Sequence, residues 1–477
     1  MTEPLWTWTA LVAAAHGKED RAPTVALNGF SIDTRTLQPG DVFVALKDVR
    51  DGHDFVSNAF KAGAGAAIVS DAYERREGDG ALVRVADPLA ALELIGAARR
   101  ADLAADARVV AVTGSAGKTG TKEMLRACFQ AVAPGRVHAS EKSYNNHWGV
   151  PLTLARMPAG TRYAVFEIGM NHAGEITPLS QMVRPHAAII TTVEAVHLEH
   201  FASVDAIADA KAEIFAGLVP GGTAIIKHDS PHRARLTDAA RRASQGVHVI
   251  SFGVTAGADV VCQSLIEDED GSTMATAVGG RPLSYRLAMP GRHVAENSLA
   301  VVAALQAVGA DVAKAVSALA ALPPPPGRGQ RIRLDVGLGE VLLIDESYNA
   351  NPASMRAALA TLSAVPRGRF GRRIVVLGDM RELGPQAADL HRGLADAVTG
   401  AGADVFFACG PLMRGLFDAL PADVRGAAAD TVNELQPLVA GALRAGDVVI
   451  VKASNGTRLW ALVEGLKSQF GVGADLR

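Results

Sequence analysis

The sequence predicts an α/β protein of three domains, and two observations lead to this prediction. First, apolar runs rich in Val and Ile alternate with alanine-rich segments of helical period, which is typical of βαβ units around buried parallel sheets. Second, the chain has 477 residues, whereas a domain usually holds about 100–200 residues, so the length predicts three domains, with two as the alternative. The expected strands are Val109–Val112, Tyr163–Ile168, Ala187–Thr192, Val341–Ile344, Ile374–Leu377 and Val448–Val451.

Two boundaries divide the chain into domains at 1–107, 108–325 and 326–477. The first precedes the strand at Val109, which begins a glycine-rich turn. The second follows from the run Pro323–Gly327, which contains four prolines and one glycine. Such a run forms neither helix nor central strand, so we expect a stiff hinge. Between the boundaries, the polar and weakly periodic segment Thr255–Pro282 predicts a short antiparallel excursion.

Composition excludes several classes of function. The formal net charge of -3 gives no basic face for a nucleic acid. No apolar run of about 18 residues predicts a membrane span, and the N-terminal stretch lacks the basic region of a secretory signal. The scattered Cys128, Cys262 and Cys409 fit neither a disulfide framework nor a zinc site. We therefore expect a cytoplasmic protein, and a monomer.

A phosphate-binding loop is the strongest motif. The strand VVAV leads into TGSAGKT, and the helix-compatible segment TKEMLRACFQAV follows. In this context glycines let backbone N–H groups surround phosphate oxygens at a helix N-terminus. Lys118 would neutralise the β- and γ-phosphates and Thr119 would ligate Mg²⁺. The alternative is a helix-capping turn that binds nothing. The nucleotide contacts expected here are Gly114, Ser115, Ala116, Gly117, Lys118, Thr119 and Gly120.

Three further residues carry weaker signals. Glu167 ends the apolar strand YAVFE, where a carboxylate can hold Mg²⁺ beside the phosphates; alternatively it caps a strand. His197 stands in a loop after a strand, and Lys211 lies in the amphipathic segment Val204–Leu218. Their residue types and spacing alone indicate a surface histidine and a solvated helix lysine.

Ten segments together resemble the Mur ligase family, in family order from about residue 31 to residue 460. They are SIDTRTLQPGDVFVALKDVRDGHDFV, VTGSAGKTGTKE, YNNHWGVPLTL, FEIGMNHAGEI, AVHLEHFAS, AKAEIFAGL, GRHVAENSLAVVAAL, DESYNANPASM, VLGDMRELG and VKASNGTRLW. SYNANP together with LGDMRELG is the most specific combination, and it is most similar to the family member that adds D-alanyl-D-alanine.

The resemblance implies a fold and an activity. The expected fold has a smaller α/β N-terminal domain that grips a uridine nucleotide, a central phosphate-loop domain with a parallel sheet, and a Rossmann-like C-terminal domain. The expected reaction joins D-Ala-D-Ala to UDP-N-acetylmuramoyl-tripeptide through an acyl phosphate, with ATP and Mg²⁺. Alternatives are another Mur-type ligase, a ligase similar to folylpolyglutamate synthetase, and a nucleotide-dependent switch or scaffold without catalysis.

The resemblance also implies roles for individual residues. Lys211 would be carbamylated, and its carbamate would hold metal together with Thr119, Glu167 and His197. The catalytic residues implied are Lys118, Glu167, His197 and the carbamylated Lys211. His293, Asn297, Arg328 and Asp345 or Glu346 would contact ATP. The substrate contacts expected from the family motifs are Ser31, Asp33, Thr34, Arg35, Asn145, Asn146, Asn349, Asn351 and Ser354. For Asn351 the alternative is a helix cap, since Pro352 follows it.

Three positions depart from the family pattern. Gly120 stands where Thr or Ser is usual, Trp148 replaces an aliphatic residue, and Glu194 occupies a position that is often Gly. None of them removes a proposed ligand. Gly120 adds backbone freedom at the start of the helix.

Overall fold

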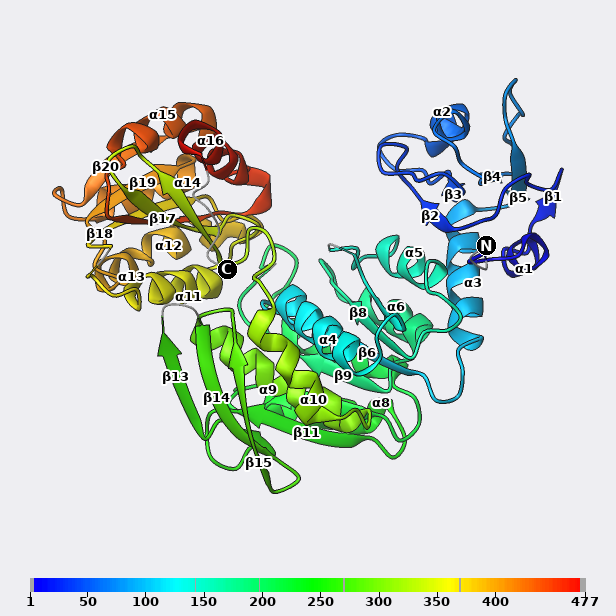
Figure 1. Cartoon of the computed structure of the whole chain (residues 1–477), viewed down its shortest axis with the longest axis horizontal. Coiled ribbons are helices and arrows are strands. Elements are labelled where there is room, and N and C mark those ends of the chain that lie inside the picture. The colour runs from blue at the N-terminus through cyan, green and yellow to red at the C-terminus, as the bar shows by residue number, and fades with distance from the viewer. Residues whose placement is uncertain (1–3, 142, 197, 269–270, 369, 472–477) are drawn as a thin grey trace.

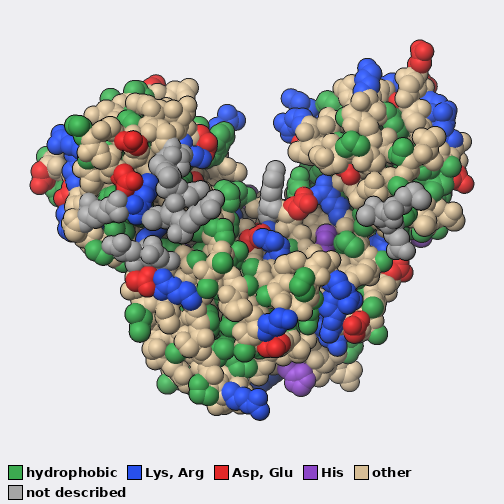
Figure 2. Space-filling model, viewed as in Figure 1, with side chains coloured by type: hydrophobic (Ala, Val, Ile, Leu, Met, Phe, Trp, Pro, Cys, Tyr) green, Lys and Arg blue, Asp and Glu red, His purple; other side chains and the backbone are tan. Residues whose placement is uncertain are grey.

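The computed structural model consists of three α/β units in chain order (Figure 1). It describes residues 4–141, 143–196, 198–268, 271–368 and 370–471. The N-terminal and C-terminal units stand on either side of the middle unit, and Figure 2 shows the surface hollowed between them. The fold class expected from the sequence, including the three-unit layout, is confirmed.

The N-terminal unit holds a five-stranded sheet of order β1-β5-β4-β3-β2. Strands β2 to β5 are parallel and β1 is antiparallel to β5. Helices α1 and α3 cover one face and α2 the other, each through a separate apolar cluster. The elements are α1 (Trp8–Ala14), β1 (Lys18–Glu19), β2 (Gly29–Ser31), β3 (Asp41–Val44), η1 (Gly52–Phe55), α2 (Val56–Lys61), β4 (Ala66–Ser70), β5 (Ala81–Val85) and α3 (Pro88–Ala101).

The middle unit is a seven-stranded parallel sheet of order β12-β11-β10-β9-β6-β8-β7. Helices cover both of its faces, which explains why its strands are continuous apolar runs. The strands are β6 (Arg108–Thr113), β7 (Val137–Ala139), β8 (Tyr163–Glu167), β9 (Ala187–Ile190), β10 (Thr223–Lys227), β11 (His248–Gly253) and β12 (Val260–Val261). Its helices are α4 (Lys118–Val132), α5 (Gly149–Ala155), α6 (Ile176–Val183), α7 (Val204–Ala212), η2 (Glu213–Gly217), α8 (Arg233–Ala243), α9 (Arg292–Ala307), α10 (Val312–Val316) and η3 (Ser317–Ala321).

The expected antiparallel excursion is present as a three-stranded sheet beside α9. It consists of β13 (Ser264–Asp268), β14 (Gly271–Val278) and β15 (Arg281–Leu287). Met274, Tyr285 and Leu287 bury one face of this sheet against the core of the middle unit. The excursion is therefore part of the middle unit and not a separate body.

The C-terminal unit has a six-stranded sheet of order β16-β17-β21-β18-β19-β20, in which only β16 is antiparallel. Its strands are β16 (Gln330–Asp335), β17 (Glu340–Glu346), β18 (Arg372–Gly378), β19 (Val405–Cys409), β20 (Arg425–Ala429) and β21 (Asp447–Lys452). Its helices are α11 (Pro352–Ser363), η4 (Gly384–Gln386), α12 (Ala387–Arg392), α13 (Ala395–Gly400), α14 (Pro411–Ala419), α15 (Val432–Ala442), η5 (Asn455–Thr457) and α16 (Trp460–Phe470).

Helix α5 is shared between two cores. Val150 and Leu154 pack into the middle unit, whereas Leu152 and Ala155 pack into the apolar cluster of the N-terminal unit. A helix of seven residues is buried on all sides here because each of its faces meets a different sheet or helix layer. Helix α5 therefore sets how the N-terminal unit sits beside the middle unit.

Candidate functional site

The phosphate loop is shaped by two glycines between β6 and α4. Gly117 has φ +81°, and a Cβ there would lie 2.4 Å from Asn297 Nδ2. Gly114 has φ +150°, and its Cβ would lie 1.9 Å from Thr191 Oγ1. Both the backbone conformation and the close neighbours therefore require glycine at these positions. The amide of Asn297 is held directly against the loop.

The end of the β9 strand anchors this loop. Ser115 N donates to Thr192 O (2.8 Å), and Ser115 Oγ accepts from the N–H of Glu194 (2.9 Å). Lys118 Nζ donates to Gly114 O (2.8 Å), so the ammonium lies folded over the loop. Burial lowers the pKa of Lys118, the Glu167 carboxylate opposes this, and the Arg328 cation lowers it further. A bound polyphosphate would supply the negative charge that this pair of cations lacks.

Glu167 is the central carboxylate of the site and is 1% exposed. It ends β8, which lies next to the loop strand β6 with Glu167 opposite Val112. Its Oε2 accepts from Thr119 Oγ1 (2.9 Å) and its Oε1 from Asn145 Nδ2 (2.8 Å). The Thr119 hydroxyl and this carboxylate are oxygen donors of the kind that Mg²⁺ prefers. The residues present therefore fit a magnesium ion beside the phosphate loop.

These groups open into a cavity of about 460 Å³ between the middle and C-terminal units, here called the central cavity. The phosphate loop forms one wall, and β17, α11 and the segment after the proline run form the other. Of the predicted site residues, the central cavity collects Ser115, Ala116, Gly117, Lys118, Thr119, Gly120, Asn145, Glu167, His293, Asn297, Arg328, Asn349, Asn351 and Ser354. Residues that are 239 positions apart thus meet at one place.

The C-terminal wall carries both charges and an aromatic ring. Arg328 lies over the ring of Tyr348, 4.1 Å from its centroid. The Tyr348 hydroxyl donates to Ser143 Oγ (2.6 Å), which joins the C-terminal unit to the middle unit. Glu346 pairs with Lys452 (3.1 Å) at the ends of two adjacent strands. A cationic and aromatic wall therefore faces the phosphate loop.

The structure distinguishes Asp345 from Glu346. Glu346 lines the central cavity, whereas Asp345 is 7% exposed and is not among its lining residues. Asp345 Oδ1 accepts from Ser347 N (3.0 Å), and burial raises the pKa of Asp345. Of the pair, Glu346 is therefore the residue that faces the central cavity.

Part of the SYNANP segment is occupied by local structure. Asn351 is the N-cap of α11, and it forms a capping box with Ser354. Asn349 Oδ1 accepts from Ala350 N (2.9 Å). The helix-cap interpretation is thus correct for Asn351, although Asn349, Asn351 and Ser354 also line the central cavity.

Lys211 is not a solvated helix lysine. It is 2% exposed and lies near the end of α7. Burial, and then the Lys118 cation, lower the pKa of Lys211 well below its ordinary value. Its interaction with Lys118 places it beside the phosphate loop. His197, the other residue singled out by resemblance, lies outside the described residues.

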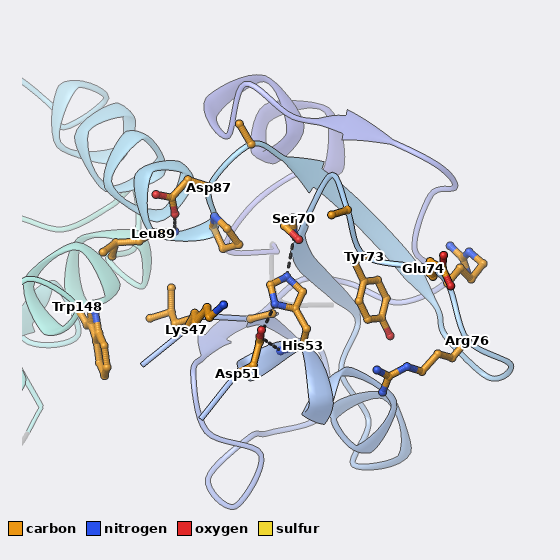
Figure 3. Close-up of a pocket in the computed structure, with 16 residues that line it drawn as sticks. Lys47, Asp51, His53, Ser70, Tyr73, Glu74, Arg76, Asp87, Leu89 and Trp148 are labelled. Carbon is orange, nitrogen blue, oxygen red and sulfur yellow. Dashed lines mark hydrogen bonds and ion pairs between the residues drawn. The ribbon is translucent and has the colours of Figure 1, made fainter. Parts of the chain in front are cut away.

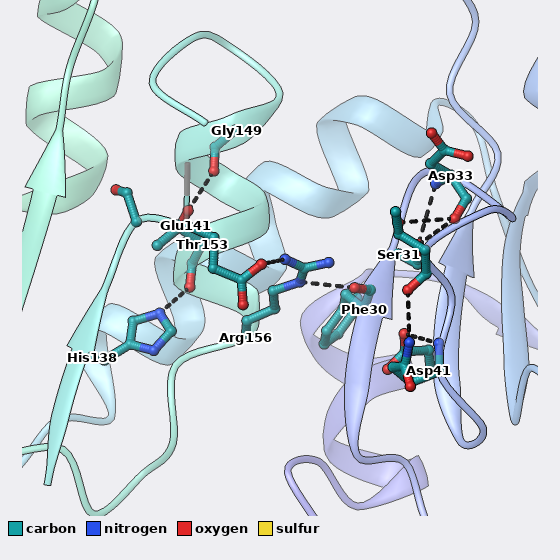
Figure 4. Close-up of polar contacts among 12 residues, drawn as sticks. Phe30, Ser31, Asp33, Asp41, His138, Glu141, Gly149, Thr153 and Arg156 are labelled. Carbon is teal, nitrogen blue, oxygen red and sulfur yellow. Dashed lines mark hydrogen bonds and ion pairs between the residues drawn. The ribbon is translucent and has the colours of Figure 1, made fainter. Parts of the chain in front are cut away.

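The expected uridine-nucleotide contacts form a separate turn at the end of β2. Ser31 is 1% exposed, and its hydroxyl donates to Asp33 O (2.9 Å). Asp33 accepts from the Arg35 guanidinium, and Arg35 is largely exposed. Figure 4 shows this turn beside the joint with the middle unit. Ser31, Asp33, Thr34 and Arg35 are not brought to the central cavity.

A salt-bridged arginine forms that joint. Arg156 Nε donates to Phe30 O (2.8 Å), and its Nη1 pairs with Glu141 Oε2 (2.8 Å) (Figure 4). Asn146 lies at the other end of α5, and its Oδ1 accepts from Gly149 N (2.9 Å). Asn146 is therefore a helix-capping residue, whereas the adjacent Asn145 is directed to Glu167.

Sequence reasoning missed several residues of the central cavity. Tyr348 and Lys452 lie inside two motifs that resemble the family, but their side chains carried no separate signal. Lys227 and Glu296 form an ion pair (2.7 Å) at the rim. Their positions, at the end of β10 and on α9, could be found only from the topology. The missed lining residues include Ser143, Lys227, Glu296, Tyr348, Lys452 and Asn455.

Comparisons with known proteins agree with the geometry. Residues 112–305 match the Mur ligase middle domain and residues 327–455 match the Mur ligase glutamate ligase domain. The chain is 30% identical to the UDP-N-acetylmuramoyl-tripeptide–D-alanyl-D-alanine ligase of Rickettsia prowazekii over 443 residues, 92% of this chain and 95% of the relative. It is 37% identical to the enzyme of the same name from Escherichia coli, covering 80% of each chain.

Solved structures give the same result. The crystal structure of MurF from Acinetobacter baumannii superposes with a TM-score of 0.83 at 30% identity, covering 97% of this chain and 99% of that one. MurF from Thermotoga maritima, solved with ADP, shares the fold with a TM-score of 0.77 at 24% identity, covering 93% of this chain and 98% of that one.

The fold and the site define an ATP-dependent ligase that has a phosphate loop and a cavity between its middle and C-terminal units. The chain belongs to the Mur ligase family, and within it to the group whose curated members carry the D-alanyl-D-alanine ligase name. The expected family and enzyme class are thereby confirmed. Among the described residues no helix is long and apolar enough to cross a membrane.

Proposed function

We propose that this chain joins D-Ala-D-Ala to UDP-N-acetylmuramoyl-tripeptide in an ATP- and Mg²⁺-dependent reaction of peptidoglycan precursor synthesis, acting in the cytoplasm as a monomer. The observation that carries the proposal is the buried Glu167, held by Thr119 and Asn145 beside the phosphate loop. The similarity to enzymes of this name over more than nine-tenths of the chain supports the choice of substrates.

The reaction proceeds in two steps. A carboxylate oxygen of the tripeptide attacks the γ-phosphorus of ATP, the bond to the bridging oxygen breaks, and ADP leaves with an acyl phosphate remaining. The amine of D-Ala-D-Ala then attacks the acyl carbon, loses a proton and displaces inorganic phosphate. The first step brings two anions together, so it requires cations that mask their repulsion.

The chain supplies these cations from two units. Lys118 lies on the phosphate loop and Arg328 on the opposite wall, and each lowers the pKa of a neighbouring cation in the absence of phosphate. Mg²⁺ bound at Thr119 and Glu167 would neutralise charge on the β- and γ-phosphate oxygens. Glu346 is the proposed ribose contact, and His293 and Asn297 are the proposed base contacts.

Water must be kept from the acyl phosphate. The central cavity lies between two units, and the Tyr348–Ser143 hydrogen bond closes one side of it. Residues 108–325 and 326–477 are the proposed domains that close on ATP about the Pro323–Gly327 segment. Residues 1–107 are the proposed domain for the uridine nucleotide.

Lys211 is proposed to be carbamylated. A neutral amine is the nucleophile toward CO₂, and burial together with Lys118 favours that neutral form. The nitrogen attacks the carbon of CO₂, a proton leaves to solvent, and the resulting carbamate is an anion. Such an anion would be attracted to Lys118, whereas the unmodified cation is repelled by it.

The test of the function is phosphate release from ATP and Mg²⁺ with the two substrates added singly and together. Release that requires both, with a product heavier by the dipeptide, is the expected result. Lys118→Ala should abolish it, and Lys314→Ala, on the exposed surface of α10, should not. Release without dependence on the pair, or with another amino-acid acceptor in place of D-Ala-D-Ala, would overturn the proposed substrates.

The carbamate has its own test. Lys211→Ala should lose turnover, and a short-chain carboxylate such as acetate or propionate should restore part of it by occupying the vacated space. Full turnover by Lys211→Ala without added carboxylate would contradict this role while leaving the ligase assignment intact.

A further inference from the structure

A second cavity lies in the N-terminal unit, with a volume of about 880 Å³, and is here called the N-terminal cavity. It opens above the C-terminal ends of β3, β4 and β5, where ligands commonly bind in parallel sheets. One wall is contributed by the middle unit, through Trp148 at the start of α5. Figure 3 shows Trp148 on the same side of the cavity as Lys47, away from Tyr73 and Arg76.

Local bonds hold Trp148 in place. Its backbone N–H and that of Gly149 donate to Asn146 Oδ1, at 3.2 and 2.9 Å. At the other end of the same short helix, Arg156 donates to Phe30 O (2.8 Å). The backbone that carries the indole is thus fixed relative to the N-terminal sheet. A ring presented in this way loses little conformational freedom when a ligand packs on it.

Apolar side chains line part of the cavity beside the indole, the His147 ring packs edge-on against it with 5.2 Å between ring centroids, and the deeper polar groups are already engaged. Leu46, Pro88 and Leu89 line the cavity with Trp148. His53 is bonded to Asp51 through Nδ1 (2.6 Å), and its Nε2 accepts from Ser70 N (2.9 Å) (Figure 3). The free surface on this side is therefore suited to a flat ring with apolar faces.

The cationic side chains of the cavity also differ in whether they already have a partner. Arg75 is paired with Asp20, and Arg76 lies over the Tyr73 ring, 5.6 Å from its centroid. Lys47 is exposed, and it forms no ion pair among the residues that the structure describes. Its ammonium helps to lower the pKa of Asp51 but remains exposed, so an anionic group of a ligand whose ring lies on Trp148 can reach it.

We propose that Trp148 is a specificity-determining residue that stacks on the uracil base of the sugar nucleotide, while Lys47 meets its diphosphate. This rests on the proposed function, in which the donor carries a uridine diphosphate. The uracil is the only planar aromatic ring of that donor, and stacking on an indole needs such a ring.

The test measures binding of UDP to the full chain by calorimetry, beside Trp148→Leu, Trp148→Phe and Lys47→Met. Trp148→Leu should weaken UDP by about tenfold, because one base stack is worth about 1–3 kcal/mol. Trp148→Phe keeps a ring and should stay within about threefold of the wild type. Trp460→Leu replaces an exposed indole on α16 and is the matched control.

Ligands without a base separate the two contacts. Inorganic pyrophosphate should bind the wild type and Trp148→Leu equally, and Lys47→Met should weaken it. Uridine should bind equally to the wild type and Lys47→Met, and Trp148→Leu should bind it more weakly. Circular dichroism of each variant verifies folding.

Three results would overturn the inference. The first is an affinity of Trp148→Leu for UDP equal to that of the wild type. The second is a lack of competition between UDP and the sugar nucleotide for the wild type. The third is a Trp148→Leu variant that loses affinity for the complete sugar nucleotide but not for UDP. The last would place the indole on the sugar or the peptide. Ligation by the wild type is measured separately with both substrates. If the wild type is active and Trp148→Leu binds UDP normally, only the base site is refuted. If the wild type is inactive, the proposed function is refuted.

Discussion

Replacing Lys211 by Met should make the middle unit more stable at neutral pH while removing activity. Lys211 is 2% exposed, and burial lowers the pKa of its amine. At pH 7 an unfolded lysine with the ordinary pKa of 10.5 is protonated. Folding must either bury that ammonium or remove its proton, and both processes cost free energy. Methionine has a similar shape and carries no charge.

The magnitude has an upper bound. The pH lies 3.5 units below the ordinary pKa of 10.5, and each unit is worth about 1.4 kcal/mol, so complete deprotonation costs about 5 kcal/mol. Imperfect packing of the methionine reduces the gain, by about 1 kcal/mol. In buffer freed of CO₂ the expected stabilisation at pH 7 is therefore about 1–4 kcal/mol.

The pH dependence distinguishes this cause from better packing. The folded-state pKa is lowered, so between that pKa and 10.5 the unfolded state binds more protons and the stability of the wild type rises with pH. The advantage of Lys211→Met should then shrink by about 1.4 kcal/mol per pH unit within this window. Hydrogen exchange of peptides from α7 measures both variants, and exchange rates in the C-terminal unit serve as the internal control.

The reasoning would be refuted if the difference in stability between Lys211→Met and the wild type stayed constant from pH 7 to pH 10. It would also be refuted if Lys211→Met were less stable than the wild type at pH 7. Bicarbonate adds a second comparison. It should slow exchange in α7 of the wild type, because the carbamate replaces a repelled cation by an anion, and it should leave Lys211→Met unchanged.

Three other predictions follow from the same contacts. Thr119→Ala removes the hydroxyl bonded to Glu167, so the ligation rate at saturating ATP should fall by about 10²–10³; a rate within twofold of the wild type would contradict the role of this pair. Arg156→Met removes the bonds to Phe30 O and Glu141, and exchange in β2 should speed up by the equivalent of about 1–3 kcal/mol, with β18 unaffected. His391 donates from Nδ1 to Ala387 O and accepts at Nε2 from Met380 N–H, and burial lowers its pKa. The unfolded state therefore binds the extra proton, and the C-terminal unit should lose stability as pH falls from 6.5 toward the folded-state pKa. His391→Gln should flatten that decline in a urea titration series, and an unchanged slope would show that another group titrates.

Local sequence patterns predicted the strands well because parallel strands buried on both faces are continuous apolar runs. Glu167 was predictable for a related reason. A polar residue that ends such a run must lie at the C-terminal edge of the sheet, and β8 is the neighbour of the loop strand β6. The glycines of the phosphate loop were predictable because their positions need positive φ and close backbone approach.

Spacing could not predict the environment of Lys211. The spacing along one helix indicates a solvated lysine, but α7 packs against α8 and η2 and into an apolar cluster of the middle unit, so only the fold reveals the burial. Asn145 and Asn146 show a second limit. They are adjacent and identical in type, yet one bonds Glu167 and the other caps α5. The direction of each amide depends on tertiary contacts that no local pattern encodes.

The segment between β7 and α5 connects the chemistry to the rest of the molecule. Ser140 Oγ accepts from the backbone N–H of Glu167 (3.2 Å), and Asn145 bonds its carboxylate. Two residues of one short segment thus hold both the main chain and the side chain of the proposed metal ligand. A shift of this segment would move the carboxylate away from Thr119.

The same segment meets both outer units. Ser143 accepts from Tyr348 of the C-terminal unit, and Trp148 forms a wall of the N-terminal cavity. Binding of the donor at Trp148, and closure of the ATP wall at Tyr348, therefore act on opposite ends of the segment that holds Glu167. The proposed donor site and the proposed ATP wall are thus linked through one short segment to the carboxylate of Glu167, which Thr119 and Asn145 hold between them.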